Sequence, residues 1–240
     1  MIAYIRAELL KQKRSFSVIL LWMVPLATIL IALVLMGGMY LQNGAYNWWY
    51  MLMLPSCFTM FSSFISTKER RKNRHGFFGI AIKKSRLWMA QVFVSTLFLL
   101  ITCMFFFVFI TIGGMLFGKT IPVFDSLLTS MVLFCTFSWQ IPLWMWLAQR
   151  FGASLSLIIS LGCNFIFPVT FSDGSFWWVP FAIPARLMCA SIHILPNGLQ
   201  VEMGSMLEDK SVIWQGIVIT VVLYIVITEI TAYWFDKCEV

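Results

Sequence analysis

Apolar side chains fill long stretches of this chain, and charged side chains are absent from them. The charge-free stretches include residues 15–67, 87–118, 151–172 and 211–228. A lipid hydrocarbon layer about 30 Å thick needs roughly 20 apolar helical residues to cross it. The pattern therefore predicts an all-α polytopic membrane protein, folded as a single transmembrane domain over residues 1–240.

Six membrane-spanning helices fit the pattern. We expect them at about 17–38, 48–66, 88–113, 127–148, 153–170 and 212–235. The first long stretch divides at Gly37-Gly38 and Gln42-Asn43-Gly44, because glycine weakens a helix and the amide side chains favour water. The first two helices should thus form a hairpin with a short, uncharged outer loop.

Composition and charge add an orientation. The chain is 60% hydrophobic and 11% charged, against roughly 25% charged in soluble domains. Short cytoplasmic loops retain Lys and Arg, which predicts both termini inside and explains the net charge of +7 better than nucleic-acid binding does. The inner cations are Arg6, Lys11, Lys13, Arg14, Lys68, Arg70, Arg71, Lys72, Arg74, Lys83, Lys84 and Arg86. The outer loops hold Lys119, Arg186 and Lys210 against Asp125, Asp173, Glu202, Glu208 and Asp209.

The first fifteen residues have the pattern of a short interfacial helix. Ile2, Ile5 and Leu9 fall on one helical face, while basic residues remain available to lipid headgroups. We expect an elbow helix on the inner leaflet; the alternative is a basic leader that sets topology without a fixed structure.

The predicted loop between the second and third helices combines charge with apolar anchors. Charges crowd residues 68–74, and Phe77, Phe78, Ile80 and Ile82 follow. A docking helix needs aromatic and aliphatic anchors ringed by charge, whereas a loop that only sets topology needs none. We favour a cytoplasmic docking helix, with the plain topological loop as the alternative.

Two further patterns have two interpretations each. Residues 175–197 are interrupted by Pro180 and Pro184 and fit a re-entrant outer hairpin or an interfacial loop with an aromatic belt. Small and polar residues recur at every fourth position of the fifth helix, which favours close helix packing, although the same face could border a substrate path. These residues are Gly152, Ser156, Ser160 and Asn164.

Catalytic and metal chemistry find little support. Gly113, Gly118, Lys119 and Thr120 match the spacing of a nucleotide-binding P-loop, but they end a lipid-spanning helix instead of joining a strand to a helix. The six cysteines are scattered and the two histidines fall on opposite sides, so no metal site is expected. Glu229 alone lies within a predicted span, where snorkelling or pairing is favoured over proton transfer.

The most specific motif is Gly44-Ala45-Tyr46-Asn47-Trp48-Trp49-Tyr50, followed by Met53-Leu54-Pro55. With residues 7–13 and Leu195-Pro196-Asn197-Gly198-Leu199, it resembles the permease subunits of ABC-2-type exporters. More narrowly, it resembles the nisin, epidermin and mutacin branches of the lantibiotic-immunity family. The motif residues carried over are Asn47, Trp48, Trp49, Tyr50, Pro55, Pro196, Asn197 and Gly198. The implied ATPase-coupling helix takes in Glu69, Arg70, Arg74, Phe77 and Phe78.

The resemblance implies an export subunit without catalytic residues, in the plasma membrane of a Gram-positive bacterium. Two copies of a cytoplasmic ATPase would bind ATP and Mg, and a second permease, related or identical, would complete the membrane domain. The expected cargo is a lantibiotic or another cationic antimicrobial peptide expelled from the membrane. The alternatives are an ABC-2 exporter of a lipid or small drug, and a membrane scaffold or sensor that transports nothing.

Overall fold

The computed structural model describes residues 1–71, 83–202 and 204–238, and this part of the chain is almost entirely helical. A single bridge pair, Ile194 with Gln200, is its only β pairing. A π-helical turn, η1, spans Trp49–Met53, and a short 3-10 turn, η3, spans Met206–Glu208. The helices are α1 Ile2–Gln12, α2 Phe16–Met36, α3 Leu41–Trp48, α4 Leu54–Arg71, α5 Lys84–Phe117, α6 Val123–Ser138, α7 Gln140–Phe151, α8 Ala153–Phe171, α9 Ile183–Ile192 and α10 Ser211–Lys237.

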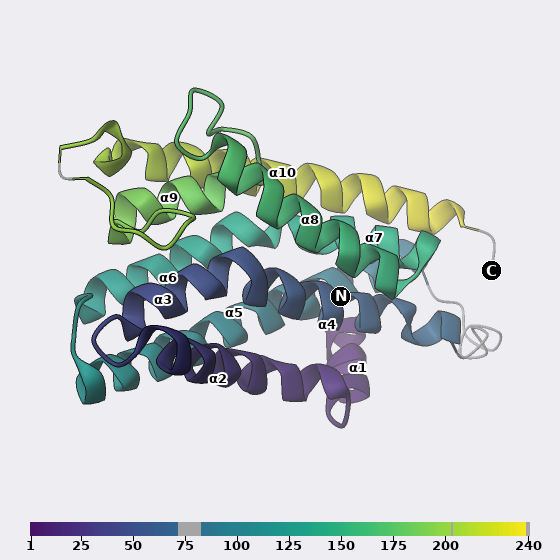
Figure 1. The fold of residues 1–240 in the computed structure, drawn as a ribbon. Helices are drawn as coiled ribbons and strands as arrows, with labels where there is room; N and C mark the ends of the chain where they lie inside the picture. The colour runs from purple at the N-terminus through teal and green to yellow at the C-terminus, as the bar shows by residue number, and fades with distance from the viewer. Residues whose placement is uncertain (72–82, 203, 239–240) are drawn as a thin grey trace.

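The long helices lie side by side, and α1 lies across one end of them (Figure 1). The N-terminus, the end of α4 and the end of α10 lie at that same end. The α2–α3 turn, the α5–α6 connection and the segment before α10 lie at the opposite end. This arrangement groups the predicted inner segments at one end and the predicted outer segments at the other.

Four described helices, α2, α5, α8 and α10, are long and apolar enough to cross a membrane, and the pair α6–α7 makes a fifth candidate. The structure thus supports a polytopic membrane protein with four or five candidate spans by length and composition. The predicted second span, 48–66, is not among them. Its counterpart, α4, is too polar by composition, because its 18 residues end in the charged run Lys68-Glu69-Arg70-Arg71. Buried hydroxyl residues such as Thr59 and Ser62 lower its hydropathy further.

The expected break at Gly37-Gly38 is confirmed, whereas the expected break at Gln42-Asn43-Gly44 is wrong. These residues lie in α3, where Gln42 and Asn43 are buried. The turn falls earlier, after Gly37, whose φ of 72° ends α2 in the left-handed region that favours glycine. The amides do not need water here, because the Gln42 side chain finds backbone partners in the α5–α6 connection.

The predicted span 127–148 is not one straight helix. The chain bends by 42° between α6 and α7, three residues before Pro142, whose ring clashes with the carbonyl four residues earlier. Pro55 has a related effect, since the π-helical turn η1 directly precedes it and joins α3 to α4. The third span is also longer than predicted, because α5 begins at Lys84.

The core lies around η1 and α4. Trp49 is fully buried and stacks on Phe106 of α5, with ring centroids 4.4 Å apart and planes 1° apart. Phe58 packs against Phe137 of α6, and Phe61 packs edge-on against Phe98. The segment 41–71 therefore occupies the middle of the bundle, where neighbouring helices surround it and its polar side chains avoid lipid.

Candidate functional site

One end of the bundle gathers three segments that are distant in the sequence. The Lys68 ammonium donates to the Lys11 carbonyl at 2.5 Å, which ties the end of α4 to α1. The Lys84 ammonium donates to the Cys238 carbonyl at 2.6 Å, and the Ser85 amide donates to Asp236 Oδ1 at 3.2 Å. We call this the basic end. The cations at this end whose side chains are described are Arg6, Lys11, Lys13, Arg14, Lys68, Lys83, Lys84, Arg86, Arg150 and Lys237.

The predicted coupling residues start at this end. Glu69 and Arg70 lie in the last turn of α4, although only their backbone belongs to the described part. Arg74, Phe77 and Phe78 fall outside the described residues. The segment between α4 and α5 thus leaves and returns at the basic end, next to α1 and the end of α10.

α1 rests on the bundle with a different face from the one predicted. Ile5 and Leu9 pack against the core, but Ile2 is 83% exposed. Glu8 and Gln12 are buried instead, joined by a 3.1 Å hydrogen bond from Gln12 Nε2 to Glu8 Oε1. Glu8 and Gln12 satisfy part of each other's hydrogen-bonding capacity, so the Glu8 carboxylate can be buried against the bundle.

The two segments of the family-like motif meet at the opposite end. Asn47 Nδ2 donates to the carbonyls of Leu195 at 3.3 Å and Pro196 at 2.9 Å. A Cβ on Gly198 would sit 3.5 Å from the Asn47 side chain. Asn47 therefore links the end of α3 to the segment that follows α9.

The other motif residues have separate places. Trp49, Tyr50 and Pro55 are buried in the core and Trp48 is half-buried. Asn197 does not bond to them; its Oδ1 accepts from the Leu199 amide at 3.0 Å and shapes the turn locally. The structure thus brings Asn47 and Pro196 together, while the aromatic residues serve the core.

A buried polar seam joins α7, α8 and α4. Gln140 and Asn164 exchange two amide hydrogen bonds of 2.9 and 2.8 Å, and the Trp144 indole donates to Gln140 Oε1 at 3.0 Å. Ser160 Oγ lies 2.7 Å from Thr59 Oγ1 of α4. These side chains are all buried and hydrogen-bonded, so the seam fixes the register of three helices.

The predicted small-residue stripe only partly follows this seam. Ser156, Ser160 and Asn164 face it, and the Ser156 hydroxyl donates to the Trp144 carbonyl at 3.1 Å. Gly152 is not on the helix; it has a φ of 100° and separates α7 from α8. The sequence prediction missed Gln140 and Thr59, although a glutamine amid apolar residues was a detectable sign.

The P-loop-like segment is capped by a side chain. α5 runs through Gly113 and ends at Gly118, whose φ is 135°. Gln42 Oε1 then accepts from the amides of Thr120 and Ile121, both at 2.8 Å. Those amides are the kind that hold phosphate in a P-loop, and here a glutamine occupies them.

Residues 4–172, well over half of the chain, match the sequence profile of the ABC-2 family transporter protein. The chain belongs to the ABC-2 transporter family. It is therefore a membrane permease component of an ABC transporter, and such permeases generally work with an ABC ATPase subunit. No curated protein and no solved structure gives a significant match.

In this ABC-2 permease, the segment between α9 and α10 is anchored by a buried arginine. Arg186 donates to the carbonyls of Leu207 at 2.6 Å and Met206 at 2.7 Å, and burial lowers the pKa of its guanidinium. Hydrogen bonds from Ser211 lower the pKa of the exposed Asp209 carboxyl, so it stays ionised at neutral pH. The end of the permease opposite the basic end therefore carries the exposed negative charge of Asp209. It lies next to the backbone of residues 206–207, which Arg186 holds.

Proposed function

We propose that this ABC-2 permease expels cationic antimicrobial peptides, lantibiotics among them, from the membrane and so gives its host immunity or resistance. A separate ATPase supplies the energy, since ATP and Mg bind to that subunit. The contact between Asn47 and Pro196 supports the peptide cargo, because it joins the two segments that resemble lantibiotic-immunity permeases.

The observation that carries the proposal is the convergence at the basic end. α1, the end of α4, the start of α5 and the end of α10 are tied together there by Lys68, Lys84 and Asp236. A partner that moves residues 69–82 would thus act directly on α4 and α5. Through the contacts of Lys68, Lys84 and Asp236, the motion would also reach α1 and α10. We infer that this segment is the coupling helix and that the ATPase docks on it through Phe77 and Phe78.

We propose six crossings in place of the four or five that composition supports. The additional crossing is the continuous segment 41–71, which at 1.5 Å per residue is about 46 Å long. Its polar side chains face neighbouring helices, so its low hydropathy does not prevent it from spanning. This topology places both termini and the basic end inside, and residues 175–197 then cap the outer mouth as a re-entrant hairpin.

The proposed complex contains two ATPase copies and two permeases, the second either related or identical to this chain. Purification from the native membrane, followed by mass spectrometry, tests it. We expect an ATPase at one copy per permease and ATP hydrolysis that rises when a lantibiotic is added. The absence of an ATPase, under conditions that keep a known ABC complex intact, would overturn the proposal.

A triple alanine variant tests the assignment of residues 69–82 as the coupling helix. Replacing Glu69, Phe77 and Phe78 by alanine should abolish peptide resistance while the permease still inserts, because docking is lost and folding is kept. Lys119→Ala, at the opposite end, is the control and should keep resistance and ATP binding by the complex. Resistance unchanged in the triple variant would rule out this segment as the coupling helix.

A further inference from the structure

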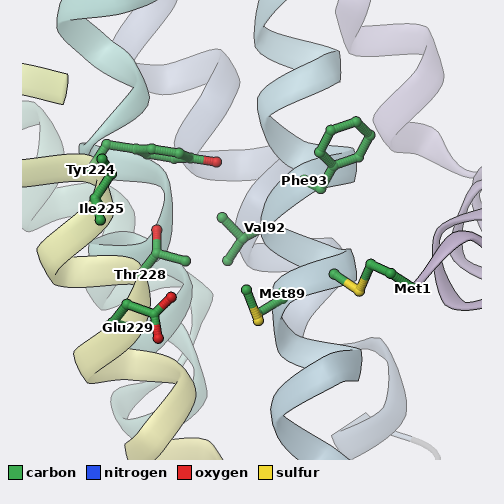
Figure 2. Close-up of a pocket in the computed structure, with 8 residues that line it drawn as sticks. All are labelled: Met1, Met89, Val92, Phe93, Tyr224, Ile225, Thr228 and Glu229. Carbon is green, nitrogen blue, oxygen red and sulfur yellow. The ribbon is translucent and has the colours of Figure 1, made fainter.

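A pocket opens between α5 and α10 near the basic end, with a volume of about 250 Å³. Met89, Val92 and Phe93 of α5 form one wall, and Met1 lies beside them (Figure 2). The other wall belongs to α10 and consists of Tyr224, Ile225, Thr228 and Glu229. The walls are largely apolar, and the charged side chain among them is Glu229, which lies across the pocket from Met89. The Tyr224 ring is held in place by a 3.0 Å hydrogen bond between its hydroxyl and Thr96 Oγ1.

The Glu229 carboxylate has no ion pair or hydrogen bond within the described ranges 1–71, 83–202 and 204–238. It is exposed, and it lies eight residues from Lys237, about 12 Å along the helix axis. Lys237 does not reach back to it, since its ammonium sits 4.4 Å from the Tyr233 ring centroid. A carboxylate at this depth of a spanning helix is costly without a partner.

A second polar group beside the pocket also lacks a partner. The hydroxyl of Thr228 is buried, and it makes no hydrogen bond to any residue in the described part of the chain. Protein atoms enclose this oxygen, and the Thr228 methyl group faces α5 across the pocket (Figure 2), so the accessible acceptor is the Glu229 carboxylate one residue further. Glu229 thus supplies an accessible anionic acceptor at the edge of a largely apolar pocket.

We propose that this pocket binds a lipophilic primary ammonium cation. The ammonium group donates to Glu229, and its apolar body packs on Val92, Phe93 and Ile225. The volume is below the roughly 300–1,000 Å³ of pockets that enclose drug-sized ligands, so it suits one alkyl chain or one ring and not a two-chain lipid. The proposal does not depend on the peptide cargo proposed above.

The test is saturation binding of radiolabelled octylammonium to the full transporter complex in nanodiscs of electrically neutral lipid, with empty discs as the blank. Octanol, which has the same chain and no charge, is the comparison ligand. Glu229→Gln should weaken octylammonium binding by at least about tenfold, because a hydrogen bond to a charged group is lost, and should leave octanol binding unchanged. Asp173→Asn removes the same charge from an exposed position at the opposite end and should change neither ligand.

A second variant tests the pocket itself. Ile225 is 56% exposed, so Ile225→Trp should fold normally while its larger ring narrows the pocket and weakens binding of both ligands at least about tenfold. Equal octylammonium affinity in the native complex and in Glu229→Gln would overturn the proposal. Equal affinity of the native complex for octanol and octylammonium would overturn it as well. Both results are read without ATP or peptide, so they are independent of peptide export.

Discussion

At the scale of single residues, Gly114 decides how closely α3 approaches α5. The Gln42 amide lies where a Cβ on Gly114 would be, and its Nε2 donates to the Ile110 carbonyl at 3.4 Å. The same amide, through Oε1, caps Thr120 and Ile121. Because Gly114 has no side chain, Gln42 can approach α5 and accept hydrogen bonds from the α5–α6 connection.

Gly114→Ala should destabilise the permease by about 1–3 kcal/mol, because the displaced Gln42 leaves two buried or half-buried backbone amides without their acceptor. The measurement is the thermal midpoint of the purified protein in detergent. Gly162→Ala is the matched control, since no atom lies within 4 Å of its added Cβ, and it should be neutral or slightly stabilising. Equal midpoints for the two variants would contradict the role of Gly114.

At the scale of elements, α7 and α8 are held together by a pair of amides. The chain reverses at Gly152, and the two helices then meet at Gln140 and Asn164, which satisfy each other. An unpaired amide at such a buried place costs more than the pair contributes in net stability. A wrong register between α7 and α8 would leave Gln140 and Asn164 unpaired, and this would cost more free energy than their pairing contributes to stability. The seam therefore acts mainly to select one register.

Gln140→Leu and Asn164→Leu should each lower the free energy of unfolding by about 1–3 kcal/mol, because each leaves its partner unsatisfied. The double variant should lose less than the two single variants together, since no orphaned amide remains. A double-mutant cycle of denaturant unfolding measures this coupling. Additive losses would mean that Gln140 and Asn164 act independently.

At the scale of the whole molecule, charge separates the two ends of the bundle. The basic end collects ten cations with described side chains, besides Arg70 and Arg71 in the last turn of α4. The other end carries Asp125, Asp173, Glu202, Glu208 and Asp209 with three cations. The positive-inside rule turns this separation into an orientation. The same separation would give cationic peptides a mildly acidic outer surface, although salt screens it beyond about 8 Å.

In a background without native cysteines, Lys119→Cys should react with a membrane-impermeant maleimide in intact cells. Arg14→Cys should react only after the membrane is permeabilised, because the proposed topology places the basic end in the cytoplasm. The readout is gel shift of the labelled chain. Labelling of Arg14→Cys in intact cells would reverse the orientation.

The sequence by itself determined the helical membrane class, the clustering of cations and four of the span positions, because lipid demands long apolar helices whatever the tertiary contacts are. α2, α8 and α10 lie within a few residues of their predicted ranges, and α5 includes its predicted range.

Only the tertiary structure decided where buried polar groups are satisfied. Hydropathy assigns Gln42 to an outer loop, yet the backbone of the α5–α6 connection supplies its partners from 78 residues away. Likewise, Gln140 is acceptable in a bent span because Asn164 faces it. Partners distant in the sequence leave no local pattern. The central position of segment 41–71, the polar seam and the unpaired state of the Glu229 carboxylate are therefore visible only when the helices are packed.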